Sequence, residues 1–271
     1  MPEYKFSGDQ QIWRVRTYRE SLQRFLVLLG ISVVFGISWQ FISANTQWGF
    51  VADAPAQTFD LLSRMFPPNL PYIIRLLRPL WDTINIATLG TLIAIVVAVP
   101  AAFLAARNTT PHPVFRPFAL AVIAFSRSVN SLIWALMLVM MIGPGILAGV
   151  LAIGLRGIGF VGKLLYEAIE EVNREAVEAV TATGASRMQI IFFAIVPQVL
   201  PTFAGITIFR WDANIRESTV VGLVGAGGIG LFLNSAIGQL LWRRASMILI
   251  VILLLVFLSE WISTKVRKAI I

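Results

Sequence analysis

The chain has 271 residues, of which 57% are hydrophobic and 13% charged, whereas a soluble domain carries about 25% charged residues. Together with a mean hydropathy of +0.79, this composition excludes an ordinary soluble fold and indicates an integral membrane protein. A formal charge of +8 would suit nucleic acid, but the basic residues flank apolar runs, so we expect a lipid bilayer and no nucleic acid as partner. With no cysteine and one histidine, the chain offers no disulfide and no clustered Cys or His ligands for a metal.

Six apolar runs are long enough to cross a bilayer as helices, which takes roughly 20 residues each. They cover residues 22–42, 84–105, 118–142, 146–165, 199–221 and 245–262. A cleaved signal peptide is the alternative for the first run, but that run is longer than the usual apolar core of about 7–15 residues. We therefore expect an all-α integral membrane protein with a cytoplasmic segment at 1–21 and one transmembrane domain at 22–271.

The distribution of basic residues predicts the orientation of these spans. With the N-terminus inside, thirteen Lys and Arg residues lie on the cytoplasmic side, and five lie outside at Arg64, Arg75, Arg78, Arg243 and Arg244. The excess of positive charge on the inner side favours cytoplasmic N- and C-termini. The irregular stretch 43–82 is then external, and it includes an amphipathic piece around 59–66 that we expect on the membrane surface.

The segment 166–197, between the fourth and fifth spans, is predicted to be a cytoplasmic loop. Apolar residues recur at helical spacing through its first half, opposite an acidic face, which predicts one amphipathic helix. On that helix the pairs Glu170–Arg174 and Arg174–Glu178 have the i,i+4 spacing of weak ion pairs.

Short-range signals predict how this helix ends and how the next one begins. Gly184 suits the left-handed residue that closes a helix, and Ser186 precedes Gln189 by three residues, as in a capping box. Pro197 lacks a backbone N–H and disturbs the hydrogen bonding near the start of the fifth span. The loop is thus predicted to be a helix, a tight turn and a short helix leading into the membrane. Two interpretations fit this pattern: an ordinary solvated hairpin, or a stiff element that passes a push from a partner into the bilayer.

The residue identities in the loop resemble a family signature. Glu178-Ala179, Gly184, Ala185-Ser186 and Pro197 have the spacing of the signature loop in membrane subunits of binding-protein-dependent ABC importers. The longer stretches GKLLYEAIEEVNREAVEAVTATGASRMQIIFFAIVPQVLP and FRWDANIRESTVVGLVGAGGIG resemble permeases of phosphonate- or phosphite-type importers.

This resemblance implies a type I ABC importer permease (MetI-like) fold in the bacterial inner membrane. It also implies a homodimer on two ATP-binding cassette subunits, fed by a periplasmic or lipid-anchored binding protein. The loop would dock on the ATPase subunit through Glu178, Ala179, Gly184, Ala185, Ser186 and Arg187.

The chemistry of transport is expected to be divided between subunits. The chain has no GxxxxGK[ST] phosphate loop, so we expect ATP and Mg²⁺ on the partner ATPase and neither a cofactor nor an enzymatic activity in this chain. The predicted cargo is phosphonate, phosphite or a related phosphorus oxyanion. One alternative is the same architecture with another cargo, such as an amino acid or an osmolyte. The other is a stand-alone secondary transporter or a membrane enzyme.

Several charged residues fall within predicted spans, where an arginine facing lipid costs about 2.5–3.5 kcal/mol. They are therefore expected to face protein or water. Asp212 and Arg216 can pair on one helix face, whereas Arg210 has no evident partner on its own span. Two roles are open, interhelical pairing or a weak lining for an oxyanion, because guanidinium groups donate in a planar fork. The candidate pathway residues are Arg127, Arg210, Asp212, Asn214 and Arg216.

A glycine-rich segment, GAGGIG at 225–230, matches the dinucleotide fingerprint GxGxxG only formally. No strand precedes it and no acidic residue follows about 20 positions later, which excludes a dinucleotide site. Glycines at membrane depth instead indicate close backbone approach. They form either a periplasmic gate or dimer contact, or a site of close helix packing; the residues concerned are Gly225, Gly227, Gly228 and Gly230. For Arg156, which also lies among glycines, we expect a structural or interfacial role.

Overall fold

The computed structural model describes residues 4–7, 10–13 and 18–270. The chain divides into two compact units, Met1–Asp60 and Leu61–Ile271. In the first unit, strands β1 (Tyr4–Ser7) and β2 (Gln10–Trp13) form an antiparallel hairpin, an addition to the predicted helical fold. Helix α1 (Tyr18–Asn45) follows, and none of its residues is buried. The sequence boundary between the two units falls within helix α2 (Trp48–Met65).

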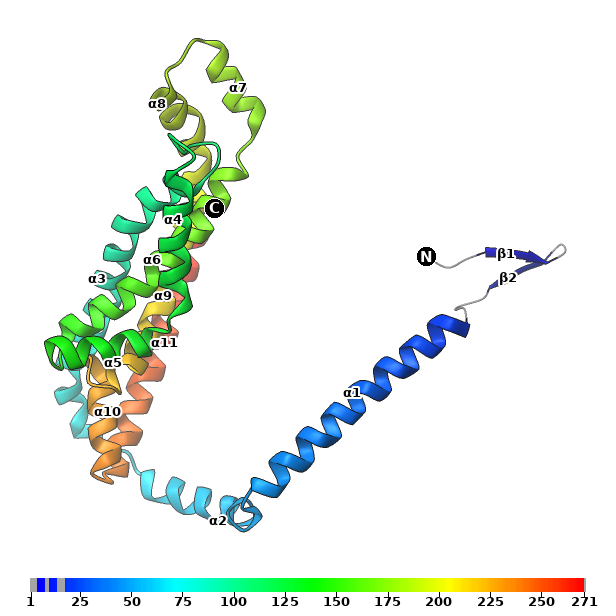
Figure 1. The fold of residues 1–271 in the computed structure, drawn as a ribbon. Coiled ribbons are helices and arrows are strands. Elements are labelled where there is room, and N and C mark those ends of the chain that lie inside the picture. The colour runs from blue at the N-terminus through cyan, green and yellow to red at the C-terminus, as the bar shows by residue number, and fades with distance from the viewer. Residues whose placement is uncertain (1–3, 8–9, 14–17, 271) are drawn as a thin grey trace. The chain divides into compact units, whose positions relative to one another are not determined.

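The second unit is a bundle of helices, with α7 and α8 projecting beyond one end of it (Figure 1). Most of its elements are long helices joined by short turns. In chain order they are the single turn η1 (Leu70–Tyr72), α3 (Ile73–Ala105), α4 (Phe115–Ser128), α5 (Ser131–Ile142), α6 (Ile146–Glu170), α7 (Arg174–Ala182), α8 (Arg187–Ile190), the π-helical turn η2 (Ile191–Ile195), α9 (Val196–Gly222), α10 (Gly228–Gly238) and α11 (Trp242–Ile270).

Five helical segments in the described part of the chain are long and apolar enough to cross a bilayer. They are Tyr18–Asn45, Leu70–Ala105, Ile146–Glu170, Arg187–Gly222 and Trp242–Ile270. The third predicted span, 118–142, is not one straight helix, because α4 and α5 meet at 88°. Asn130 causes the break: its backbone is extended, and its side chain accepts a hydrogen bond from the Leu132 N–H at 3.1 Å, which starts a new helix.

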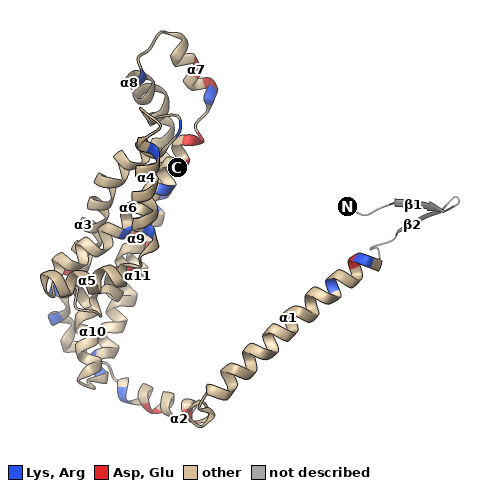
Figure 2. Ribbon diagram, in the orientation of Figure 1, with Lys and Arg blue, Asp and Glu red and all other residues tan. Residues whose placement is uncertain are grey.

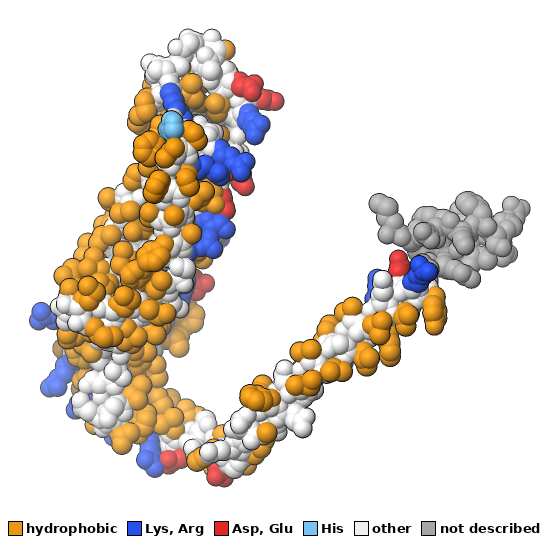
Figure 3. All heavy atoms as spheres, viewed as in Figure 1, with side chains coloured by type: hydrophobic (Ala, Val, Ile, Leu, Met, Phe, Trp, Pro, Cys, Tyr) orange, Lys and Arg blue, Asp and Glu red, His pale blue; other side chains and the backbone are white. Residues whose placement is uncertain are grey.

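Helices α3 and α6 pack closely because small residues lie where they cross. A Cβ atom added at Gly90 would lie 2.8 Å from Ile153 Cγ2, and one added at Gly157 would lie 2.6 Å from Ala94 Cβ. The most apolar part of α6 is 61% buried, more than any other candidate span. Apolar side chains cover most of the bundle surface that Figure 3 shows, as expected for a surface that faces lipid.

The connection between α9 and α10 also depends on small residues. A Cβ added at Gly222 would lie 2.9 Å from the Cα atom of Gly230, and one added at Gly230 would clash with the carbonyl oxygen of Thr219. The first turn of α10 is tied to α3, since the Ile229 N–H donates to Thr83 Oγ1 at 2.8 Å. Close packing is therefore the role that the bundle itself shows for this glycine segment.

Candidate coupling loop and intramembrane charge cluster

The first helix predicted for the loop between α6 and α9 is divided in two, into the end of α6 and the separate helix α7, while the predicted short helix is α8. Helix α6 ends at Glu170, and Asn173 starts α7 by accepting a hydrogen bond from the Glu175 N–H at 2.8 Å. The predicted i,i+4 pairs of Arg174 with Glu170 and Glu178 are wrong, since among the described residues Arg174 forms no ion pair. The break at Asn173 places Glu170 and Arg174 on different helices.

The predicted turn and cap are confirmed. Gly184 has φ +79°, a left-handed conformation that costs little only without a Cβ atom, and its N–H donates to the Thr181 carbonyl at 3.0 Å. Ser186 and Gln189 form a capping box, in which the Ser186 N–H donates to Gln189 Oε1 at 2.7 Å. The loop thus enters α8 with its first backbone donors satisfied.

The short helix α8 continues into the membrane without a break. Through the π-helical turn the Val196 N–H donates to the Ile191 carbonyl, which lets the helix pass Pro197 although that residue has no N–H to donate. The segment Arg187–Gly222 is therefore one helical span of 36 residues. A displacement of α8 would reach the centre of the bundle along this rod.

The six predicted coupling residues do not all face the same way. Arg187 reaches back toward its own bundle: its guanidinium donates to the carbonyl oxygens of Pro111 at 3.2 Å and Thr109 at 3.3 Å, and also to that of Thr110. The other five lie on α7 and the following turn, with Ala185 half-buried and the rest exposed: Glu178, Ala179, Gly184, Ala185 and Ser186.

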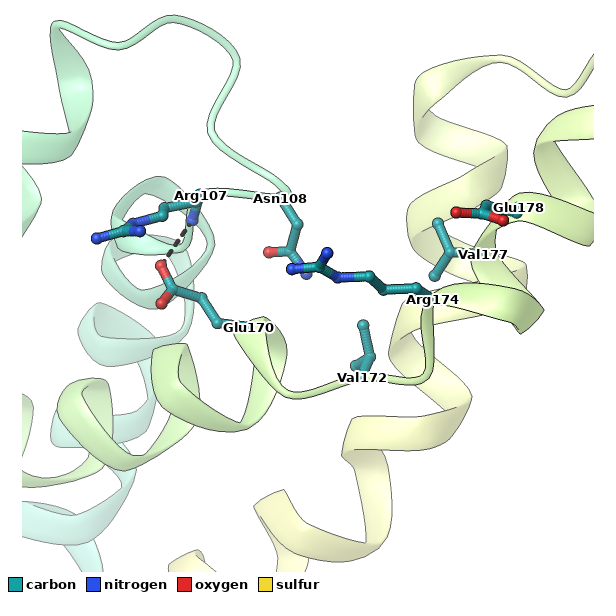
Figure 4. A pocket seen from close by; sticks show the side chains of 7 residues that line it. All are labelled: Arg107, Asn108, Glu170, Val172, Arg174, Val177 and Glu178. Carbon is teal, nitrogen blue, oxygen red and sulfur yellow. Dashed lines mark hydrogen bonds between the residues drawn. The ribbon is translucent and has the colours of Figure 1, made fainter.

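A second tie joins the end of α6 to the α3–α4 loop. The Arg107 N–H donates to Glu170 Oε1 at 2.9 Å, and Arg116 Nη2 lies 3.8 Å from the same oxygen. Between this tie and α7 lies a hollow of about 410 Å³ (Figure 4), lined by Arg107, Asn108, Glu170, Val172, Arg174, Val177 and Glu178. The loop that contains α7 and α8 is therefore in contact with the α3–α4 segment.

The most concentrated charge inside the bundle centres on Glu217 of α9. Arg210 Nη2 lies 2.8 Å from Glu217 Oε2, while Arg156 of α6 pairs with Oε1 and the Ser131 hydroxyl of α5 donates to that same oxygen. The expectation that Arg210 lacks a partner on its own span is wrong, because seven residues are about two helical turns. Arg210 and Glu217 are 5% and 12% exposed, so this pair lies in the interior.

The other polar residues of α9 bond within α9 and to neighbouring helices. Arg216 pairs with Asp212 at 2.6 Å, as predicted, and Asp212 accepts a hydrogen bond from the Ser259 hydroxyl of α11 at 2.7 Å. The side-chain amide of Asn214 donates to Thr91 Oγ1 of α3 at 2.8 Å. Helix α9 therefore forms polar side-chain bonds to several neighbouring helices. Figure 2 shows the charged residues beside α6 and α9.

Arg127 stands apart from the other predicted pathway residues. It belongs to α4, where a Cβ added at Gly159 of α6 would lie 2.7 Å from its backbone nitrogen. Arg210 lies beside Gly157, from whose added Cβ its Nε is 3.9 Å away. Since two residues of a helix are about 200° apart around the axis, α6 separates Arg127 from Arg210. The residues that do share one helix are Arg210, Asp212, Asn214 and Arg216.

Two residues of the Glu217 cluster, Glu217 and Ser131, were not among the pathway residues predicted from the sequence. Glu217 could have been found, because an acid seven residues after Arg210 lies on nearly the same helix face. Ser131 gave no such indication, since it is 86 residues away from Glu217 in sequence. For Arg156 the expected structural role fits its ion pair with Glu217.

The remaining glycines allow the α9–α10 turn to lie close to other helices. The Gly145 N–H donates to the Gly225 carbonyl at 3.0 Å. An added Cβ would lie 3.0 Å from the Ile146 nitrogen at Gly227 and 2.7 Å from a Thr83 oxygen at Gly228. The turn therefore packs against the start of α6 and against α3 at Thr83.

Comparison with known proteins identifies the family. Residues 98–271 match the binding-protein-dependent transport system inner membrane component family. The chain belongs to this family. It is thus the inner-membrane permease component of an ABC importer, a subunit without a catalytic role, as the sequence predicted.

Two curated relatives resemble this permease over most of its length. The phosphite transport system permease protein PtxC of Stutzerimonas stutzeri is 43% identical over 208 residues, which cover 77% of this chain and 76% of that protein. The phosphate-import permease protein PhnE of Mycolicibacterium smegmatis is 42% identical over 208 residues, covering 77% of this chain and 39% of that longer protein.

Solved structures share the fold of the permease. A chain of the MetNI methionine ABC transporter in an inward-facing conformation matches with a TM-score of 0.63 at 20% identity, covering 74% of this chain and 98% of that one. A chain of a bacterial alginate ABC transporter, solved with its periplasmic protein, matches with a TM-score of 0.55 at 15% identity, covering 93% and 99%. The predicted MetI-like permease fold is confirmed.

Proposed function

We propose that this permease carries phosphite, a phosphonate or phosphate into the cytoplasm. The observation that carries the proposal is the 43% identity to a phosphite permease across about three quarters of both chains. The charges inside the bundle support an anionic cargo: Arg156 and Arg210 share the single carboxylate of Glu217, which leaves one positive charge in excess. The alternative is another small solute, such as an amino acid or an osmolyte, carried by the same architecture.

The working assembly in this proposal contains two copies of the permease and two ATPase subunits that bind ATP and Mg²⁺. A periplasmic or lipid-anchored binding protein delivers the cargo. Both chain termini are cytoplasmic, and the loop that contains α7 and α8 faces the ATPase. The excess of basic residues on that side of the membrane supports this orientation.

Coupling in this assembly runs through the exposed face of α7 and its turn. Glu178, Ala179, Gly184, Ala185 and Ser186 contact the ATPase, while Arg187 connects the loop to the α3–α4 segment. ATP binding closes the two ATPase subunits and displaces α8. Because α8, η2 and α9 are one rod, that displacement moves Glu217 and its arginines relative to α6.

The cargo path in the proposal is a weakly cationic lining, with specificity held by the binding protein. Tight binding inside the permease would slow release of the ion. The residues of this lining on α9 are Arg210, Asp212, Asn214 and Arg216, and Arg127 contributes its charge from the other side of α6. A gate on the outer side is formed by the turn that contains Gly225, Gly227, Gly228 and Gly230.

The test is ATP hydrolysis and uptake by the complex reconstituted in vesicles with its matching binding protein. We expect phosphite, methylphosphonate or phosphate to stimulate both activities, and glycine betaine and methionine to stimulate neither. Stimulation by glycine betaine or methionine alone would overturn the cargo assignment. Uptake that continues when the ATPase subunits are omitted would overturn the importer mechanism itself.

A further inference from the structure

A second hollow lies between α4 and α6, level with the last turns of α6 before the coupling loop. Its volume is about 440 Å³, and its lining combines apolar side chains of α4 with two cations, Arg127 of α4 and Lys163 of α6. The lining residues are Leu120, Ile123, Ala124, Arg127, Ser128, Lys163 and Tyr166.

The charges of this hollow are not balanced. Among the described residues the side chain of Arg127 forms no hydrogen bond and no ion pair. Lys163 has one partner, Glu167 at 3.4 Å, and both of these side chains are more than a third exposed. Such an exposed pair is weak, about 0–1 kcal/mol. One positive charge therefore remains in excess in this hollow, whereas Arg210 and Arg216 each have a carboxylate partner.

The backbone that carries Arg127 is locked to α6. The Ser126 hydroxyl accepts a hydrogen bond from the Gly159 N–H at 2.7 Å and donates to the Leu155 carbonyl. One hydroxyl thus bonds to a backbone donor and a backbone acceptor that lie four residues apart on α6. Gly159 permits this approach, since its added Cβ would lie 2.5 Å from the Ile123 carbonyl oxygen. Arg127, the next residue, is consequently held at a fixed height opposite α6.

We propose that this hollow binds a tetrahedral phosphorus oxyanion. The guanidinium of Arg127 supplies a planar pair of donors, and the Lys163 ammonium adds a compact charge, a combination suited to phosphorus-bound oxygens. Tyr166 also lines the hollow and carries a hydroxyl group. Two sources present this chemistry: the free ion that the permease carries, which rests on the proposed function, and the phosphate of an anionic phospholipid, which does not.

The experiment uses the purified permease–ATPase complex with two probes. Radiolabelled inorganic phosphate is titrated by equilibrium dialysis, and phosphatidylglycerol that co-purifies from membranes is counted by native mass spectrometry. The variant Arg127→Gln/Lys163→Gln should bind its ligand about tenfold or more weakly, since each lost contact is charge-assisted. Arg127→Lys keeps the charge but not the planar pair of donors, so its affinity for the ligand should fall about threefold. Lys268→Gln, an exposed cation in the last turn of α11, is the matched control and should leave binding unchanged.

Loss of labelled phosphate in the double variant would assign the hollow to the free ion, and loss of phosphatidylglycerol would assign it to lipid; either result supports the proposal. Absence of both ligands from the wild-type complex, or equal retention in the double variant, would overturn it. Should the double variant fail to assemble, Arg127→Lys decides by the same criterion. The outcome is independent of cargo uptake, so failure here leaves the transport assay to judge the proposed function separately.

Discussion

The coupling loop and the Glu217 cluster satisfy their polar groups over very different distances in sequence. In the loop, Asn173 caps α7 two residues on and Gln189 caps the start of α8 three residues back. In the cluster, Glu217 pairs with Arg156, 61 residues away, and accepts from Ser131, 86 residues away. The loop is exposed and the cluster is buried, so a lost partner is replaced by water in one and by nothing in the other. Changes in the loop should therefore affect coupling, and changes in the cluster should affect the integrity of the bundle.

The largest effect is expected from Glu217→Gln. The change leaves Arg210 without a carboxylate in the interior, and breaking a buried ion pair costs about 3–5 kcal/mol. Arg156, which is 35% exposed, also loses its partner. The complex should therefore unfold at clearly lower temperature, as measured by thermal denaturation followed by size-exclusion chromatography. Glu260→Gln removes an exposed carboxylate on α11 and should change stability by no more than about 0.5 kcal/mol. Equal melting of the two variants would contradict the buried cluster.

An intermediate effect is expected from Gly184→Asp. No atom lies within 4 Å of the added Cβ position, and Asp adopts φ > 0 more readily than most residues, so the bundle should still assemble and insert. The new charge stands on the turn proposed to face the ATPase, and loss of coupling should lower uptake by about 5–150-fold. Uptake and complex assembly are measured together in vesicles. Gly184→Asn, which has nearly the same shape and tolerates φ > 0, separates the effect of charge from that of size. Normal uptake by the Asp variant at normal expression would refute the coupling role.

The smallest effect is expected from Arg187→Gln. The substitution releases the carbonyl oxygens of the α3–α4 loop but leaves the α8–α9 rod intact. Networks of this kind change coupling by about 0.5–2 kcal/mol, or about 2–30-fold in uptake per ATP hydrolysed. Arg187→Lys keeps the charge with fewer donors and should fall between the wild type and the Gln variant. If both variants match the wild type, the α3–α4 loop takes no part in coupling.

The residues that short-range physics controls were largely predictable. Gly184 and the Ser186–Gln189 box act within one helical turn, so their sequence spacing already contains their geometry. Asn130 and Asn173 are both helix N-caps. Each starts a new helix at a point where apolar periodicity alone predicts that the preceding helix continues. Periodicity shows which residues can share a face, but it does not show where a polar side chain captures the backbone and starts a new helix.

What the sequence alone determined is the membrane-spanning helical plan, the family and the form of the loop's turn, because lipid requires every backbone group to bond within its own helix. What only the tertiary structure decided is which charges neutralise each other. Glu217 of α9 meets Arg156 of α6, and Ser126 of α4 forms hydrogen bonds with the backbone of α6. Those partners are far apart in the chain, and they meet only because glycines of α6 let the neighbouring backbones come close.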